Sequence, residues 1–207
     1  MKDFSVSMAL VDYVPVILFA AAVVLLMRDL YNKMSKGAFA LFAAGAIDIV
    51  CAGTFKATYK LLYASGACDF EALNAMFFPV QSIGFLLAGI GIIAMLCNKK
   101  SAVCAVVPPV FSGTFVFVGL MVAGLGLMDV ALCILSVKLK KPALIALFSV
   151  SFICSLCMGY LSSQDFAQAS MNWIAEGVNV VGQGALFAGV LFLHKSGLCG
   201  LKLRDGE

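Results

Sequence analysis

The stretch from Ala102 to Val137, AVCAVVPPVFSGTFVFVGLMVAGLGLMDVALCILSV, decides how many times this chain can cross a membrane. It runs for 36 residues and carries one charged side chain, that of Asp129. As a single helix it would be about 54 Å long, because an α-helix rises 1.5 Å per residue. The hydrocarbon core of a bilayer is only about 30 Å thick. We therefore predict two shorter helices joined by a tight turn near Leu120–Gly126, where LMVAGLG supplies the glycines that a buried turn requires.

The whole chain shares the apolar character of this stretch. Of its 207 residues, 63% are hydrophobic and 12% are charged, and its mean hydropathy is +1.06. Soluble domains contain roughly 25% charged residues, and a soluble core of this size cannot bury so much apolar surface. The composition therefore excludes a soluble globular enzyme and also a disordered chain. It predicts an all-α, polytopic integral membrane protein whose surroundings are the lipid bilayer.

Five further runs are long enough for a membrane helix, which requires about 20 apolar residues. With the two helices expected between Ala102 and Val137, they make seven spans in a single transmembrane helical domain, residues 1–207. The five runs are Val11–Met27, Ala38–Leu62, Ala75–Cys97, Pro142–Leu161 and Trp173–Leu193.

Basic residues decide between six and seven spans. With seven, the loops after the first, third, fifth and seventh spans lie on one side and hold 11 of the 14 Lys and Arg residues. With six, the clusters at Lys99 and Lys138 would lie on opposite faces. Cytoplasmic loops of membrane proteins are enriched in Lys and Arg. We therefore expect seven spans in the cell (plasma) membrane, with the N-terminus outside and the C-terminus in the cytoplasm. We expect no nucleic-acid partner, because no soluble basic face is present.

Two loops share a pattern that indicates an internal repeat. The sequence YASGACDF begins at Tyr63 and YLSSQDF begins at Tyr160, so both contain Tyr-x-Ser followed by Asp-Phe. Repeat 1 would cover about residues 11–99, a linker helix about 102–120, and repeat 2 about 122–195. The two repeats would then cross the membrane in the same direction, which is one of the known plans of transporters.

This organisation resembles the three-plus-one-plus-three helix plan of the SWEET sugar-transporter and PQ-loop families, which have seven spans and an outside N-terminus. The resemblance covers the whole chain and concerns the number and direction of the spans. It implies a transport protein with two pseudo-symmetric halves. The Pro-Gln dipeptide that names the PQ-loop family is absent, since residues 78–81 read FPVQ. No site residue is carried over from these families.

Charged residues within the spans are candidate site residues, because an ionisable group in a membrane is costly. Asp48 lies near the middle of the second span, and Lys56 lies eight positions later, nearer the outer end. Asp129 lies in the outer half of the fifth span. Asp12 and Lys60 have structural interpretations, since an acid near a helix N-terminus favours the helix dipole and a lysine near a span end can extend to the interface.

Amide side chains add to this set. Glu176, Asn179 and Gln183 are spaced three and four residues apart, which places them on one stripe of the seventh span. Gln81 is the corresponding polar group of the third span. We expect these four residues to line an outward-opening pocket between the repeats, with Asp48 at its floor, Lys56 as a counter-charge and Asp129 as a further substrate-binding residue. The alternative for the amides is hydrogen bonding between helices.

Carboxamides both donate and accept hydrogen bonds, so the pocket suits a small polar or zwitterionic solute. Transport of such a solute is our first functional expectation, with proton coupling through the mid-membrane Asp48, because a low dielectric favours the neutral acid. The alternatives are a membrane-embedded enzyme acting on lipid, and a substrate-binding or sensory subunit. A second copy of the chain or a partner membrane subunit would fit any of these. We expect no cofactor and no metal, because the single histidine, His194, follows the last span.

Overall fold

The computed structural model describes residues 5–97, 114–161 and 169–201. Within these ranges all regular elements are helices, and six of them are long and apolar enough to cross a membrane. This agrees with the all-α membrane architecture that composition predicts. The elements are α1 (Val6–Val11), α2 (Tyr13–Leu30), η1 (Tyr31–Lys33), α3 (Lys36–Ala64), α4 (Glu71–Cys97), α5 (Thr114–Lys138), η2 (Pro142–Leu144), α6 (Ile145–Leu161), α7 (Ala169–Lys195) and η3 (Leu198–Gly200).

Local sequence sets several of the helix ends. The hydroxyl groups of Ser5 and Ser35 each accept a hydrogen bond of 3.2 Å from the backbone N–H three residues later, and so cap α1 and α3. Gly66 follows α3 with a φ of +69°, and Gly197 follows α7 with a φ of +89°. Both values lie in the left-handed region, which glycine adopts without a steric penalty. Asp12 alone separates α1 from α2, so these two helices form one span.

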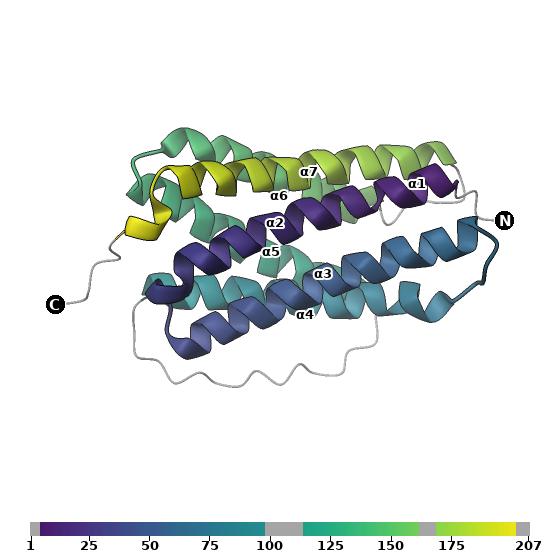
Figure 1. The fold of residues 1–207 in the computed structure, drawn as a ribbon, viewed down its shortest axis with the longest axis horizontal. Coiled ribbons are helices and arrows are strands. Elements are labelled where there is room, and N and C mark those ends of the chain that lie inside the picture. Colours follow the sequence, from purple (N-terminus) through teal and green to yellow (C-terminus); the bar gives the residue numbers. More distant parts are fainter. Residues whose placement is uncertain (1–4, 98–113, 162–168, 202–207) are drawn as a thin grey trace.

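The six long helices form a closed ring in chain order, because each contacts the next and α7 returns to contact α2. Consecutive helices are antiparallel except for α4 and α5, which run in the same direction. The Ser82 hydroxyl on α4 donates to the Phe117 carbonyl oxygen on α5 at 2.7 Å, and seven residues further along both helices Gly89 faces Gly124. The start of α5 therefore lies at the opposite end of the bundle from the end of α4. As a result, the described termini also lie at opposite ends (Figure 1).

The turn predicted near Leu120–Gly126 is wrong, because α5 is continuous from Thr114 to Lys138. The glycines there serve close packing instead. A Cβ added at Gly124 would lie 2.5 Å from the backbone of Phe85 and Leu86 on α4. The expected linker helix, about residues 102–120, falls mostly outside the described residues, and its part from Thr114 onward belongs to α5. The start expected for repeat 2, near residue 122, is likewise inside this helix.

Small residues also join the helices on either side of α4. Gly45 on α3 packs against the backbone of Gly84 and Ala88, and Gly91 on α4 packs against the backbone of α3 near Phe42. Lipid is as apolar as a leucine side chain, so helices in a membrane associate mainly through such close packing. The glycine contacts thus bring α3, α4 and α5 together as one tightly packed wall of the ring.

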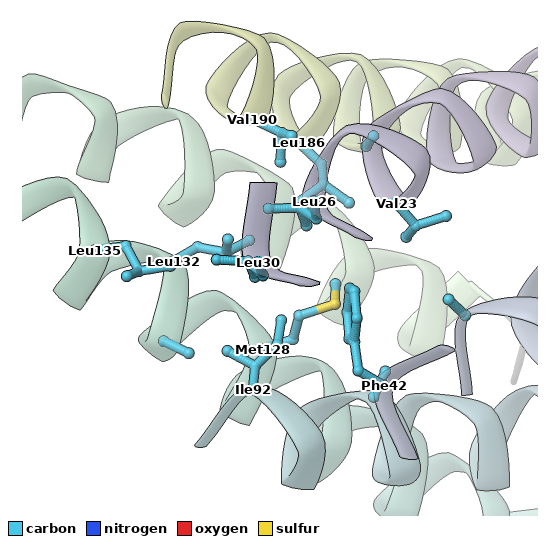
Figure 2. Close-up of a cluster of buried hydrophobic side chains, with 14 of the residues drawn as sticks. Val23, Leu26, Leu30, Phe42, Ile92, Met128, Leu132, Leu135, Leu186 and Val190 are labelled. Atoms are coloured by element: carbon cyan, nitrogen blue, oxygen red, sulfur yellow. The ribbon is translucent and has the colours of Figure 1, made fainter. Parts of the chain in front are cut away.

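A cluster of buried apolar side chains packs between the helices of the ring, and Figure 2 shows part of it. All six long helices contribute to it, and its members include Leu26, Leu30, Phe42, Ile92, Met128, Leu132, Leu135, Phe148, Leu186 and Val190. We call this cluster the apolar seal. Its members lie mostly in the C-terminal halves of α2, α4, α5 and α7, which end at the same end of the bundle.

Basic side chains gather at the same end of the bundle. The basic segments 28–36 and 138–141 and Lys195 lie at or just after the C-terminal ends of α2, α5 and α7. Contacts between α2 and α7 tie this end together. Arg28 donates to Nε2 of His194 at 2.7 Å, and Nδ1 of His194 lies 2.7 Å from the buried Asp29 carboxylate. Because arginine only donates, the His194 ring carries its proton on Nδ1. The Lys33 ammonium donates to two carbonyl oxygens at residues 199 and 201, at 2.8 and 2.6 Å.

Candidate functional site

The half of the bundle opposite the apolar seal contains a cavity of about 470 Å³, which we call the polar cavity. All six long helices contribute to its wall. The contributing parts are the beginnings of α2, α4 and α7, the later part of α3, the end of α6 and the first half of α5. Its polar lining consists of Asp12, Lys56, Tyr59, Lys60, Asn74, Gln81, Ser155, Asn172, Glu176, Asn179 and Gln183.

A buried ion triad forms part of the wall. The Lys60 ammonium lies 2.6 Å from Oδ2 of Asp12 and 2.6 Å from Oε1 of Glu176. The three residues are 5%, 5% and 3% exposed. They come from the junction of α1 with α2, from α3 and from α7, so the triad connects three helices. Charges removed from water must be paired in this way, because an uncompensated buried charge costs several kcal/mol.

Lys56 lies one helical turn before Lys60 on the same face of α3, and it is half-buried. Its ammonium stands 4.6 Å from the centre of the Phe77 ring on α4, a cation–π contact. It makes no hydrogen bond or ion pair with any other residue in the described ranges. The polar cavity thus contains two acids and two lysines whose formal charges cancel, yet the Lys56 ammonium is left without a carboxylate in contact.

Two amide side chains also have unused hydrogen-bonding capacity. The side-chain carbonyl oxygens of Gln81 on α4 and Gln183 on α7 are buried and have no partner in the part of the chain that the structure describes. Both residues line the polar cavity. A buried acceptor without a partner costs about 1–3 kcal/mol, so these oxygens favour a bound molecule that donates hydrogen bonds.

The structure brings together five of the seven residues that the sequence nominated for a pocket. Lys56, Gln81, Glu176, Asn179 and Gln183 all line the polar cavity, and they come from α3, α4 and α7.

The other two nominated residues lie elsewhere. Asp48 does not line the polar cavity, so its expected place at the floor is wrong. It is half-buried on α3 and lies against α4, because a Cβ added to Gly84 on α4 would stand 3.0 Å from the Cβ of Asp48. Eight residues correspond to 800° of rotation, so Asp48 points about 80° away from Lys56. Asp129 is buried in a second cavity of about 310 Å³ between α5 and α6.

Sequence reasoning missed the pairing of Asp12 with Lys60. Lys60 does not extend to the outer interface, as snorkelling would require, because it is buried between two carboxylates. One available signal was the spacing of Lys56 and Lys60, which places both on one face of α3. Asp12 offered no such signal, because its partners lie far away in the sequence.

Among the described residues, no group of three His, Cys, Asp or Glu side chains is placed to hold a metal ion. The seven cysteines in these ranges are free thiols. Comparison of the chain with protein-family models, with curated proteins and with solved structures finds no match. The functional argument therefore depends on the geometry of the cavity and on the direction of the helices.

Proposed function

We propose that this protein transports a small polar or zwitterionic solute across the cell membrane. The observation that carries the proposal is a polar cavity at one end of a helical ring whose other end is closed by the apolar seal. A binding cavity on one side of a closed barrier is what alternating access requires of each conformation. Its volume, about 470 Å³, falls within the roughly 300–1,000 Å³ of small-molecule sites.

The unpaired groups of the cavity suggest how a solute is held. The Lys56 ammonium would bind an anionic group such as a carboxylate, because it has no anionic partner in contact. The side-chain carbonyl oxygens of Gln81 and Gln183 would accept hydrogen bonds from N–H or O–H groups of the same solute. A molecule with a carboxylate at one end and donors at the other would satisfy all three groups at once.

Charge supports an orientation in which the polar cavity faces outward. The basic segments collect at the end of the apolar seal, and basic loops of membrane proteins lie in the cytoplasm. Because α4 and α5 are parallel, the described termini lie at opposite ends of the bundle, which supports an odd number of crossings. Seven spans with the N-terminus outside remain our proposal on these grounds.

The order of helix directions supports an internal repeat of the parallel kind. The first half, α2 to α4, and the second half, α5 to α7, each run up, down and up, and the halves meet where α4 contacts α5 and α7 contacts α2. The polar cavity lies between them. Rocking of one half against the other would close the cavity on one side and open it on the other.

The test begins with thermal stability of the purified chain in detergent, screened against a panel of small metabolites that includes the common L-amino acids. A ligand raises the apparent stability by mass action. Each ligand found is then offered as a radiolabelled solute to proteoliposomes. We expect specific uptake. Binding without uptake would favour a substrate-binding or sensory subunit instead, and turnover of a lipid would favour the enzyme alternative.

The variant Lys56→Met keeps the length of the side chain and removes its charge. We expect it to weaken binding of the anionic solute by roughly 10–100-fold, because a hydrogen bond to a charged group contributes about 1.5–3 kcal/mol. Lys36→Met is the matched control, since Lys36 is exposed at the far end of α3. Equal affinity in both variants would show that Lys56 does not hold the solute.

A further inference from the structure

The second cavity, about 310 Å³ between α5 and α6, is lined by an acid that the polar cavity does not use. Asp129 is 4% exposed, and both of its carboxyl oxygens lack a hydrogen-bond partner among the described residues. It also forms no ion pair with a Lys, Arg or His in these ranges. The rest of the wall is largely apolar and includes Phe148 and Phe152 of α6, with Ser149 as its hydroxyl-bearing member.

An ionised carboxylate in these surroundings would have neither a cation nor a hydrogen-bond donor from the described residues to stabilise it. Burial of an isolated charge is so costly that the group neutralises instead. A carboxylic acid needs no counter-ion and loses only ordinary hydrogen bonds. In this conformation, therefore, Asp129 holds a proton.

The neighbouring ionisable groups do not change this conclusion. Cys133, one turn further along α5, is the other titratable side chain in the wall, and as a thiol it brings no positive charge. The helices packed against α5 bring no charged group to the wall. The ionisable residues of these helices lie elsewhere, namely Glu71 and Cys97 on α4, Cys154, Cys157 and Tyr160 on α6, and Glu176, His194 and Lys195 on α7.

The position of Asp129 relates it to the proposed transport path. Leu125, one turn before it on α5, lines the polar cavity, and Met128 and Leu132 beside it belong to the apolar seal. The acid is thus about 6 Å deeper along the helix than the cavity wall. It stands at the level that must open to the cytoplasm if the solute is to leave.

We propose that Asp129 is the proton-binding site that couples solute transport to a proton gradient, an inference that rests on the proposed function. With the polar cavity open to the outside, the acid is neutral. When the seal opens and water enters between α5 and α6, the O–H bond of the acid breaks, the proton passes to a water molecule and the carboxylate remains. The emptied bundle returns to the outward conformation with Asp129 ionised, and the carboxylate then takes up a proton from the outer solution, so each cycle carries one proton inward together with the solute.

The first arm of the test needs no solute. Infrared spectra of the full chain in lipid at neutral pH are compared for wild type, Asp129→Asn and Glu71→Gln. We expect a protonated-carboxyl band that shifts in D₂O and is lost only in Asp129→Asn. Glu71 is an exposed acid at the start of α4 and serves as the matched control. A wild-type spectrum identical to that of Asp129→Asn in this region would overturn the proposal.

The second arm measures coupling in proteoliposomes, with a radiolabelled mixture of the common L-amino acids as the probe. For wild type and Glu71→Gln, we expect accumulation of up to about tenfold for each unit of pH difference. Asp129→Asn resembles the permanently protonated acid, so it should exchange preloaded solute but not accumulate it. Asp129→Glu should restore accumulation, which separates coupling from a folding defect.

The outcomes distinguish the two proposals. Absence of wild-type uptake would refute transport of these solutes, while the infrared arm still decides whether Asp129 holds a proton. Accumulation by Asp129→Asn equal to that of wild type, or accumulation driven by sodium in place of protons, would refute the coupling role.

Discussion

Lys60 illustrates how much depends on single charges inside this bundle. Its ammonium is shared by two carboxylates that approach from α7 and from the junction of α1 with α2. Removing one member of a buried ion group leaves the others uncompensated, whereas replacing all members by neutral residues is often harmless. The triad therefore stabilises the bundle only as a complete set.

This reasoning predicts a large loss of stability for Lys60→Met. We expect a loss of about 3–5 kcal/mol, because Asp12 and Glu176 would then face each other without a cation in contact. The loss is measured by thermal unfolding in detergent. Combining Lys60→Met with Asp12→Asn and Glu176→Gln should recover most of the stability. If the triple variant were no more stable than Lys60→Met alone, charge compensation would not be the role of the triad.

Part of the candidate site was predictable from the sequence, because helical spacing determines which residues share one face of a helix. Glu176, Asn179 and Gln183 recur with helical spacing, so one helix places them on one stripe, and the structure puts that stripe on the polar cavity. The Lys60–Glu176 pair joins residues 116 positions apart. No local periodicity carries that information, because it depends on how distant helices pack.

At the scale of a helix, glycine is the residue whose structural role depends most on its neighbours. Gly124 and Gly119 both lie in α5, five residues apart. A Cβ at Gly124 would lie 2.5 Å from backbone atoms of α4, while a Cβ at Gly119 would meet nothing within 4 Å. The same residue type is thus a point of closest helix approach at one position and open to substitution at the other.

This contrast gives a matched pair of variants. Gly124→Ala should destabilise the protein by about 1–3 kcal/mol, because overpacking forces backbone shifts. Gly119→Ala should be neutral or stabilise by up to about 1 kcal/mol, since alanine is the better helix former. Thermal unfolding of both variants in the same detergent checks the difference. Equal unfolding temperatures would mean that α4 and α5 do not pack through Gly124.

The same ambiguity explains why the sequence misled us about α5. Glycines between Leu120 and Gly126 are compatible with a tight turn and with a close helix contact. Only the presence of α4 against Gly124 distinguishes the two. By contrast, the existence of long apolar helices was predictable, since it follows from composition and length alone.

At the scale of the whole molecule, the bundle has two unlike ends. One holds the polar cavity, with the acids Asp69 and Glu71 just before and at the start of α4, and the other holds the apolar seal and the basic segments. Parallel packing of α4 and α5 is the feature that gives the two halves the same order of helix directions. The orientation of the chain in the membrane thus determines which side the cavity serves.

Two native cysteines can report this orientation. Cys68 is exposed in the loop between α3 and α4, at the cavity end, and Cys199 is exposed beside the basic end. In chains that keep one of these and replace the other cysteines by serine or alanine, a membrane-impermeant maleimide should label Cys68 in intact cells. It should label Cys199 only after permeabilisation, because positive residues favour the cytoplasm. A chain without cysteines serves as the control for background.

Other patterns of cysteine labelling would indicate other arrangements of the bundle in the membrane. Labelling of both cysteines in intact cells would place both ends of the bundle on one side of the membrane. That result would contradict a bundle that spans the membrane with α4 and α5 parallel. Labelling of Cys199 alone would keep the spanning bundle but turn the polar cavity toward the cytoplasm. In that case the apolar seal would be the outer barrier, and Asp129 would hold its proton in the inward-facing conformation and release it on the outer side when the seal opens.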